Sequence, residues 1–204
     1  MAEAVATPIA AAPPEAEAPA ANAEAPAEAD EDTGDAAGQS EEQAEEATGD
    51  TEEGADEAAQ KAADAKEAEK KAVEALCTLM MGAADQYAVP ADFFIRLIWK
   101  ESRFNAGAVS PVGAQGIAQF MPGTARLRGL KDPFDREQAL YASASFLADM
   151  KADFGSWGLA AIGYNGGPNR VMPLVRGTGG LPYETIDYVF SITGRSHQYW
   201  ASRA

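Results

Sequence analysis

The chain has 204 residues and a formal net charge of −16, from 32 acidic and 16 basic residues. Its single His and single Cys exclude a structural zinc site of the usual kind, because such sites take four Cys or His ligands. The basic residues are scattered and no Gly-rich segment carries the Lys of a phosphate-binding loop, so we expect no nucleic-acid partner, metal or other cofactor.

The acidic charge belongs to the first part of the chain. Residues 1–60 hold 18 acids and no Lys or Arg, whereas the rest, with 14 acids and 16 bases, has a net charge of +2. This Ala-, Glu- and Pro-rich segment has too few large apolar side chains to offset chain entropy, so we expect a disordered tail over 1–60. It shows no secretory signal, since the first basic residue is Lys61, and its short apolar run is interrupted by Pro8 and cannot span a membrane.

A helix is expected to lead from the tail into a folded domain. Residues 61–74 have good helical propensity but little to bury, which predicts a helical linker or a frayed helix start. Beyond them, one face repeats at helical spacing through Leu76, Met80, Ala83 and Tyr87. Cys77 cannot form an intramolecular disulfide, and we interpret it as a small core residue. Residues 75–204 suffice for one compact domain of several helices.

The next helix carries an acid on its apolar face. Pro90 suits its first turn, and Glu101 falls seven residues after Phe94, in line with the apolar positions of the same helix. Burial disfavours the charged form of a carboxyl, so we expect the pKa of Glu101 to lie above its ordinary value. This position alone leaves a structural role and a functional role equally open.

A loop rich in Gly and Pro follows this acid and carries hydroxyl and amide side chains. Its polar candidates are Ser110, Gln115 and Gln119, and Met121 closes the segment. An inward acid followed by a tight loop of this kind suits a cleft for a polar, uncharged ligand such as a sugar. The alternative is an ordinary corner between two helices.

The remaining segments also predict helices. Asp135 is expected to cap a helix that ends at Gly155, and Ser156 to cap the next helix, over 157–165. A short helix is expected around residues 169–175, and Pro182 begins the helix that contains Glu184 and Tyr188. The buried positions expected in the helix before Gly155 are Leu140, Ala144, Leu147 and Phe154. No segment alternates as a strand would, so the predicted fold class is all-α.

Three motifs occur in order along this part of the chain. The first comprises Glu101-Ser102, the segment SPVGAQG (110–116), the segment QFMP (119–122) and Thr124-Ala125; the second is AIGYNGGP (161–168); the third is Glu184-Thr185 with Tyr188-Val189. Together they resemble the signature of the soluble lytic transglycosylase (SLT) family, of the lysozyme-like superfamily, over roughly residues 75 to 195. Gly163 and Gly166 stand where that family usually has Ala, and Phe120 where it often has Ile.

This resemblance implies a lysozyme-like catalytic domain that acts on peptidoglycan glycan strands. In such an enzyme one Glu, here Glu101, protonates the oxygen between N-acetylmuramic acid and N-acetylglucosamine. It then acts as base on the muramyl C6 hydroxyl, so that a 1,6-anhydro end forms without water. The residues offer no obvious second carboxylate of the kind that hydrolytic glycosidases use. A hydrolytic muramidase similar to goose-type lysozyme, and a catalytically silent glycan-binding or secretion-accessory domain, remain alternatives.

The resemblance also implies roles for other residues. Ser110 would hydrogen-bond near Glu101, and Gln119 and Met121 would line the sugar subsites. Tyr164 and Asn165 would face Glu101 across the cleft, whereas Glu184 would either support the cleft or contact the stem peptide. The implied location is the periplasm or cell envelope, reached through an upstream signal or a specialised secretion route, with secretion or envelope machinery as a possible partner.

Overall fold

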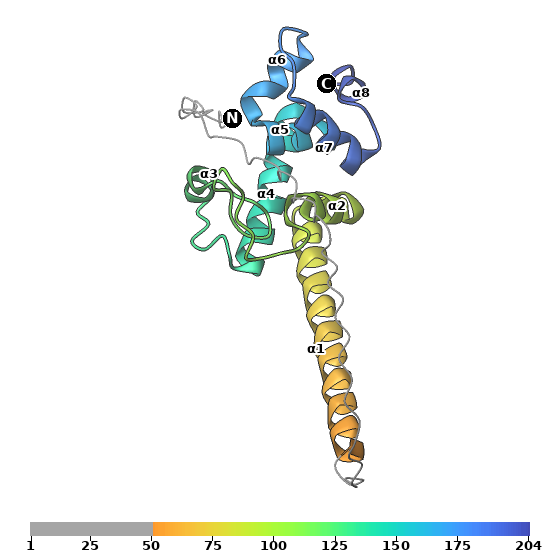
Figure 1. The fold of residues 1–204 in the computed structure, drawn as a ribbon. Helices are drawn as coiled ribbons and strands as arrows, with labels where there is room; N and C mark the ends of the chain where they lie inside the picture. Colours follow the sequence, from red (N-terminus) through yellow and green to blue (C-terminus); the bar gives the residue numbers. More distant parts are fainter. Residues whose placement is uncertain (1–50) are drawn as a thin grey trace, which may run out of the picture. The chain divides into compact units, whose positions relative to one another are not determined.

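The computed structural model describes residues 51–204, and within this range it contains helices, two isolated β-bridges and no strand (Figure 1). The elements in chain order are α1 (Thr51–Gln86), α2 (Ala91–Ser102), α3 (Pro122–Leu127), α4 (Arg136–Phe154), α5 (Trp157–Gly166), the 3-10 helix η1 (Pro168–Arg170), α6 (Val171–Val175), α7 (Tyr183–Thr193) and α8 (His197–Ala201). The all-α class predicted from the sequence is confirmed. No helix in this range is long and apolar enough to cross a membrane.

Helix α1 begins earlier than the sequence suggested. It starts at Thr51, inside the segment expected to be disordered, and the remainder of that segment lies outside the described residues. The compact unit that holds α2 to α8 includes α1 only from Leu79 onward, and the preceding part of α1 falls in a separate unit. Met80 and Ala83 are buried as expected.

The expectation for Cys77 is wrong: its side chain is exposed. The apolar composition around it suggested burial, but Cys77 precedes the start of the compact unit at Leu79. Its neighbours on α1 from 71 to 75 are likewise exposed, so this turn of the helix has no core to join. Composition predicted the helix correctly and misjudged where its packed part begins.

Helix α2 forms and ends as its sequence predicts. Pro90 precedes its first residue, and its C-cap, Arg103, adopts a left-handed conformation with φ of 51° that stops the helix. Phe94, Leu97 and Ile98 are fully buried on one face. The same face carries Glu101, so burying this apolar stripe also buries the carboxyl.

The loop between α2 and α3 is compact and closes on its own backbone. Its two β-bridges pair Gln115 with Val109 and with Phe120. Gly116 has φ of +76°, and a Cβ at this position would lie 1.7 Å from the carbonyl oxygen of Pro133. Only Gly can therefore occupy this position, where the loop touches the segment that leads into α4.

Helix α5 is the central helix of the compact unit and packs against α4, α6, α7 and α8. Caps set its limits: the Ser156 hydroxyl accepts from the Leu159 N–H, and Asp135 caps α4 in the same way. The residues from Gly158 to Gly167 are all buried. A Cβ on Gly158 would lie 2.1 Å from the indole ring of Trp200. Trp200 of α8 therefore packs directly against the backbone of α5 at Gly158, where there is no side chain.

The C-terminal helices follow the predicted order with one change. The short helix expected around 169–175 divides into η1 and α6. Pro182 precedes α7, which buries Thr185, Tyr188 and Val189 on the face toward the core. In the helix before Gly155, Leu140, Ala144 and Leu147 are buried as expected, and Phe154 is only partly buried.

Candidate active site

Glu101 lies in the last turn of α2 with only 1% of its surface exposed. Burial raises the pKa of this carboxyl to about 8, because the apolar surroundings disfavour its charged form. The hydrogen bond from Tyr188 opposes this rise, and the negative charge of Glu184 adds to it. The direction matches the expectation from the sequence. At neutral pH this carboxyl therefore holds a proton that it can donate.

Tyr188, on α7, holds the carboxyl in place. Its buried hydroxyl donates a hydrogen bond to Glu101 Oε1. Burial and the nearby Glu101 charge raise the pKa of Tyr188 well above its ordinary value, so this hydroxyl stays protonated and remains a donor. When Glu101 is also protonated, its own proton belongs on Oε2, because Oε1 accepts from Tyr188.

Sequence reasoning missed this contact. In the sequence Tyr188 stands only as part of the third motif, and the residues expected near the acid are Ser110, Tyr164 and Asn165. A signal was present in its spacing, since Thr185, Tyr188 and Ile192 share one buried face of α7. A tyrosine on such a face needs a partner for its hydroxyl. What the sequence did not indicate is that α7 packs against α2.

Tyr164, on α5, lies close enough to Glu101 for their charges to interact. Burial raises the pKa of Tyr164 well above its ordinary value, and the Glu101 charge raises it further. Its hydroxyl donates to the Ala118 carbonyl at 2.8 Å and lies 3.1 Å from the Ser143 hydroxyl. The hydroxyl therefore fastens the loop to α5 and α4. That Tyr164 also faces a substrate stays a prediction.

Asn165 follows Tyr164 and is 4% exposed. Its Oδ1 accepts a hydrogen bond of 2.8 Å from the Thr185 hydroxyl on α7. Its Nδ2 is buried and has no hydrogen-bond partner among the described residues. A buried amide donor without an acceptor costs roughly 1–3 kcal/mol, so this group is well suited to an acceptor oxygen on a ligand.

The loop candidates use their polar atoms within the loop. The Ser110 hydroxyl oxygen accepts from the Ala114 N–H at 3.0 Å. The Gln119 amide donates to the carbonyls of Gly116 at 2.8 Å and Ala108 at 3.2 Å, and Gln119 itself has φ of 49°. These contacts hold the loop, so the expected contacts of Ser110 and Gln119 with substrate stay predictions.

Two further candidates, Met121 and Glu184, lie at the starts of α3 and α7. Met121 is buried and is the N-cap residue of α3, directly after the loop. Glu184 is exposed in the first turn of α7, and its charge reaches Glu101. Residues 51–204 contain no group of three or more His, Cys, Asp or Glu side chains that could hold a metal ion. The chemistry these residues offer is proton transfer by one buried acid.

Comparison with known proteins identifies the family. The model of the transglycosylase SLT domain matches residues 78–186, more than half of the chain, and the chain belongs to this family. The match includes α2, the loop, α5 and the start of α7, and it ends two residues before Tyr188.

Individual relatives agree with this assignment. The chain is 33% identical over 91 residues to a transglycosylase of Enterobacteria phage PRD1, covering 44% of this chain and 34% of that protein. It is 36% identical over 101 residues to the peptidoglycan transglycosylase gp16 of Escherichia phage T7, covering 46% of this chain and 8% of that protein. The matches thus span about a third or less of these relatives' lengths.

A solved structure has the same helical fold. The 70 kDa soluble lytic transglycosylase of Escherichia coli superposes with a TM-score of 0.50 at 25% identity, over 56% of this chain and 22% of that one. The helical domain predicted from the three motifs therefore has the fold seen in this lytic transglycosylase.

Proposed function

We propose that this chain is a peptidoglycan lytic transglycosylase. It cleaves the bond between N-acetylmuramic acid and N-acetylglucosamine without water and leaves 1,6-anhydromuramyl ends. The observation that carries this proposal is the state of Glu101: a carboxyl buried on α2, with its pKa raised to about 8 and its Oε1 held by Tyr188. The family membership and the relatives named as transglycosylases support the choice of substrate.

In the proposed first step, Glu101 is a general acid. It gives its proton to the glycosidic oxygen while the bond from that oxygen to muramyl C1 breaks. The N-acetyl carbonyl oxygen of the substrate stabilises the positive charge that develops at C1. The Asn165 amide is a suitable donor to an acceptor oxygen of the bound sugar, because its Nδ2 has no acceptor among residues 51–204.

In the second step, Glu101 is a general base. The C6 hydroxyl oxygen of the same sugar forms a bond to C1 and its proton returns to Glu101, which restores the acid. The Tyr188 hydroxyl stabilises the carboxylate between the two steps, since a hydrogen bond to the charged form favours it. No water and no second carboxylate are consumed, so one acid suffices for the cycle.

We place this activity in residues 75–204 and in the periplasm or cell envelope, where the substrate lies. The tail before residue 61 is assigned no catalytic role. Ser110 and Gln119 shape the sugar site by fixing the loop, Met121 lines a sugar subsite, and Glu184 contributes mainly through its charge near Glu101.

The products of digestion test the proposal. Isolated peptidoglycan is incubated with the full chain, and the soluble fragments are analysed by mass spectrometry. We expect 1,6-anhydromuramyl ends, which lack the mass of one water relative to reducing ends. Reducing ends would instead identify a hydrolytic muramidase, and the absence of fragments a glycan-binding domain; either result overturns the proposal.

A further inference from the structure

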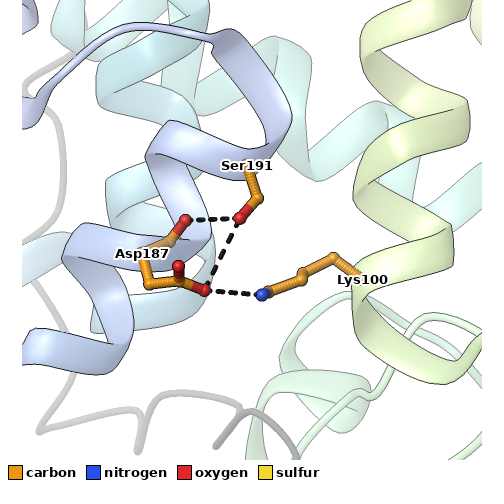
Figure 2. A network of polar contacts seen from close by, with 3 residues as sticks. All are labelled: Lys100, Asp187 and Ser191. Carbon is orange, nitrogen blue, oxygen red and sulfur yellow. Dashed lines mark hydrogen bonds and ion pairs between the residues drawn. The ribbon is translucent and has the colours of Figure 1, made fainter.

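An ion pair beside the catalytic pair joins the same two helices. Lys100 Nζ on α2 lies 2.7 Å from Asp187 Oδ2 on α7 (Figure 2). Each partner precedes a residue of the Glu101–Tyr188 hydrogen bond, and both contacts span 87 positions in sequence. The two contacts therefore join the same two helices at neighbouring positions, with one contact buried and the other partly exposed.

Asp187 is itself held in position. The Ser191 hydroxyl, one turn along α7, donates to the Asp187 carbonyl at 2.8 Å and lies 3.5 Å from Asp187 Oδ2 (Figure 2). Farther along the interface, the Arg96 guanidinium on α2 donates to the Ile192 carbonyl on α7 at 3.3 Å. Rising numbers on α2 thus meet falling numbers on α7, so the two helices run in opposite directions at this contact.

The exposure of this ion pair argues against a large contribution to stability. The Lys100 and Asp187 side chains are 33% and 50% exposed, and solvent screens pairs of this kind. Such a pair can still affect catalysis by fixing the position of neighbouring side chains, because a catalytic group must be held within about 0.5 Å of its productive place. Sliding α7 along α2 would lengthen the Tyr188–Glu101 bond, and the ion pair opposes this movement.

We propose that Lys100 and Asp187 are positioning residues, which act outside the cleft to hold Tyr188 against the carboxyl of Glu101. The inference rests on the proposed role of Glu101. Neither residue is one of the motif residues quoted above. Lys100 directly precedes the first motif, and Asp187 lies between Thr185 and Tyr188 of the third.

The variants Lys100→Met and Asp187→Asn test the pair. Each removes one charge and keeps a similar shape, and we expect kcat to fall about threefold to tenfold while KM stays within about twofold. The matched control is Asp149→Asn, which breaks the ion pair between Arg128, at the end of α3, and Asp149 on α4: that pair is also 2.7 Å long and is 23% and 59% exposed. The control is expected to keep wild-type kcat.

Titration of Glu101 separates positioning from a direct effect of charge. Tyr188 lowers the pKa of Glu101, so a loosened hydrogen bond should raise this pKa in both variants. Direct action through space would raise it in Lys100→Met and lower it in Asp187→Asn. The other groups that influence this carboxyl, Glu184 on α7 and Tyr164 on α5, are unchanged in every variant.

The measurement is a side-chain carboxyl NMR titration, with Glu101→Gln identifying the signal. An upward shift in both variants, with recovery in the exchanged variant Lys100→Asp/Asp187→Lys, supports the proposal. Shifts of opposite sign, or none, overturn it. The titration needs no turnover, so a wild-type chain that fails to cleave peptidoglycan would refute the proposed function without deciding this inference.

Discussion

The candidate site residues come from two regions that use their polar side chains differently. In the loop between α2 and α3, Ser110 and Gln119 bond to nearby backbone groups. On the helices, Tyr188 bonds to the acid itself, and Asn165 keeps a donor with no partner among the described residues. These polar groups of the loop thus hold its own shape, whereas the helices carry the proposed acid and its hydrogen-bond partner. Polarity in a motif does not by itself distinguish these two uses.

The largest expected effect is that of Glu101→Gln, which removes the proposed catalytic acid. Turnover of peptidoglycan should fall at least roughly 10²- to 10⁴-fold, because the amide keeps the volume but has no proton to transfer. Product formation measured by mass spectrometry checks this. A rate within a few-fold of wild type would move the acid elsewhere, with Glu184 the next candidate.

The pH dependence of stability in the same variant checks that the pKa of Glu101 is raised. With a folded pKa of about 8, Glu101 keeps a proton that the unfolded chain releases near its ordinary value of 4.5. The wild-type chain therefore loses stability as the pH rises from about 5 through 8, and this loss should be absent in Glu101→Gln. Thermal unfolding of both chains at several pH values measures the difference.

Tyr188→Phe tests the helical region next. We expect a reduction of roughly tenfold in kcat, since one hydrogen bond to the carboxylate is lost. That bond lowers the pKa of Glu101, so the upper limb of the pH–activity profile should move to higher pH. A profile that stays at wild-type pH would mean that Tyr188 does not act on the acid.

Asn165→Ala and Gln119→Ala sharpen the comparison directly. Removing the Asn165 side chain deletes a donor without a partner, so binding of glycan fragments should weaken. It also removes the acceptor of the Thr185 hydroxyl, so the free energy of unfolding should fall by about 1–3 kcal/mol. Removing the Gln119 amide leaves two loop carbonyls without their donor and should lower the free energy of unfolding by about 1–3 kcal/mol. Calorimetric binding and chemical denaturation of both variants distinguish the regions. Equal effects on both measurements would erase the distinction.

The smallest expected effect is that of removing residues 1–71. A chain beginning at Ala72 retains all of the compact unit from Leu79 onward. It should keep its unfolding temperature and cleave isolated peptidoglycan at least as well as the full chain, since the acidic tail would repel anionic stem peptides more than guide them. Loss of stability or of activity would show that the tail belongs to the enzyme.

Local signals in the sequence were sufficient for most of the fold. The caps at Asp135 and Ser156, the stop at Gly155 and the buried stripe ending at Glu101 are all properties of neighbouring residues, and the structure has each of them. The burial of Glu101 followed from helical spacing alone. What spacing cannot give is which helix will face a given stripe.

The misjudged residues depend on such distant contacts. The partner of Glu101 is Tyr188, 87 residues away, and nothing near either residue specifies the pairing. Cys77 is exposed because the packed part of its helix begins at Leu79, a limit set by the rest of the domain. The Gln119 amide donates to carbonyls of its own loop, which side-chain type does not reveal, and its contact with substrate stays a prediction.

The packing of Trp200 against Gly158 constrains which substitutions this domain can accept at these two positions. A side chain added at Gly158 meets the indole ring at 2.1 Å, so that substitution displaces α8 whenever Trp200 is present. A smaller residue at 200 meets no such obstacle and opens the space first. As long as Trp200 keeps its present position, residue 158 has room only for Gly.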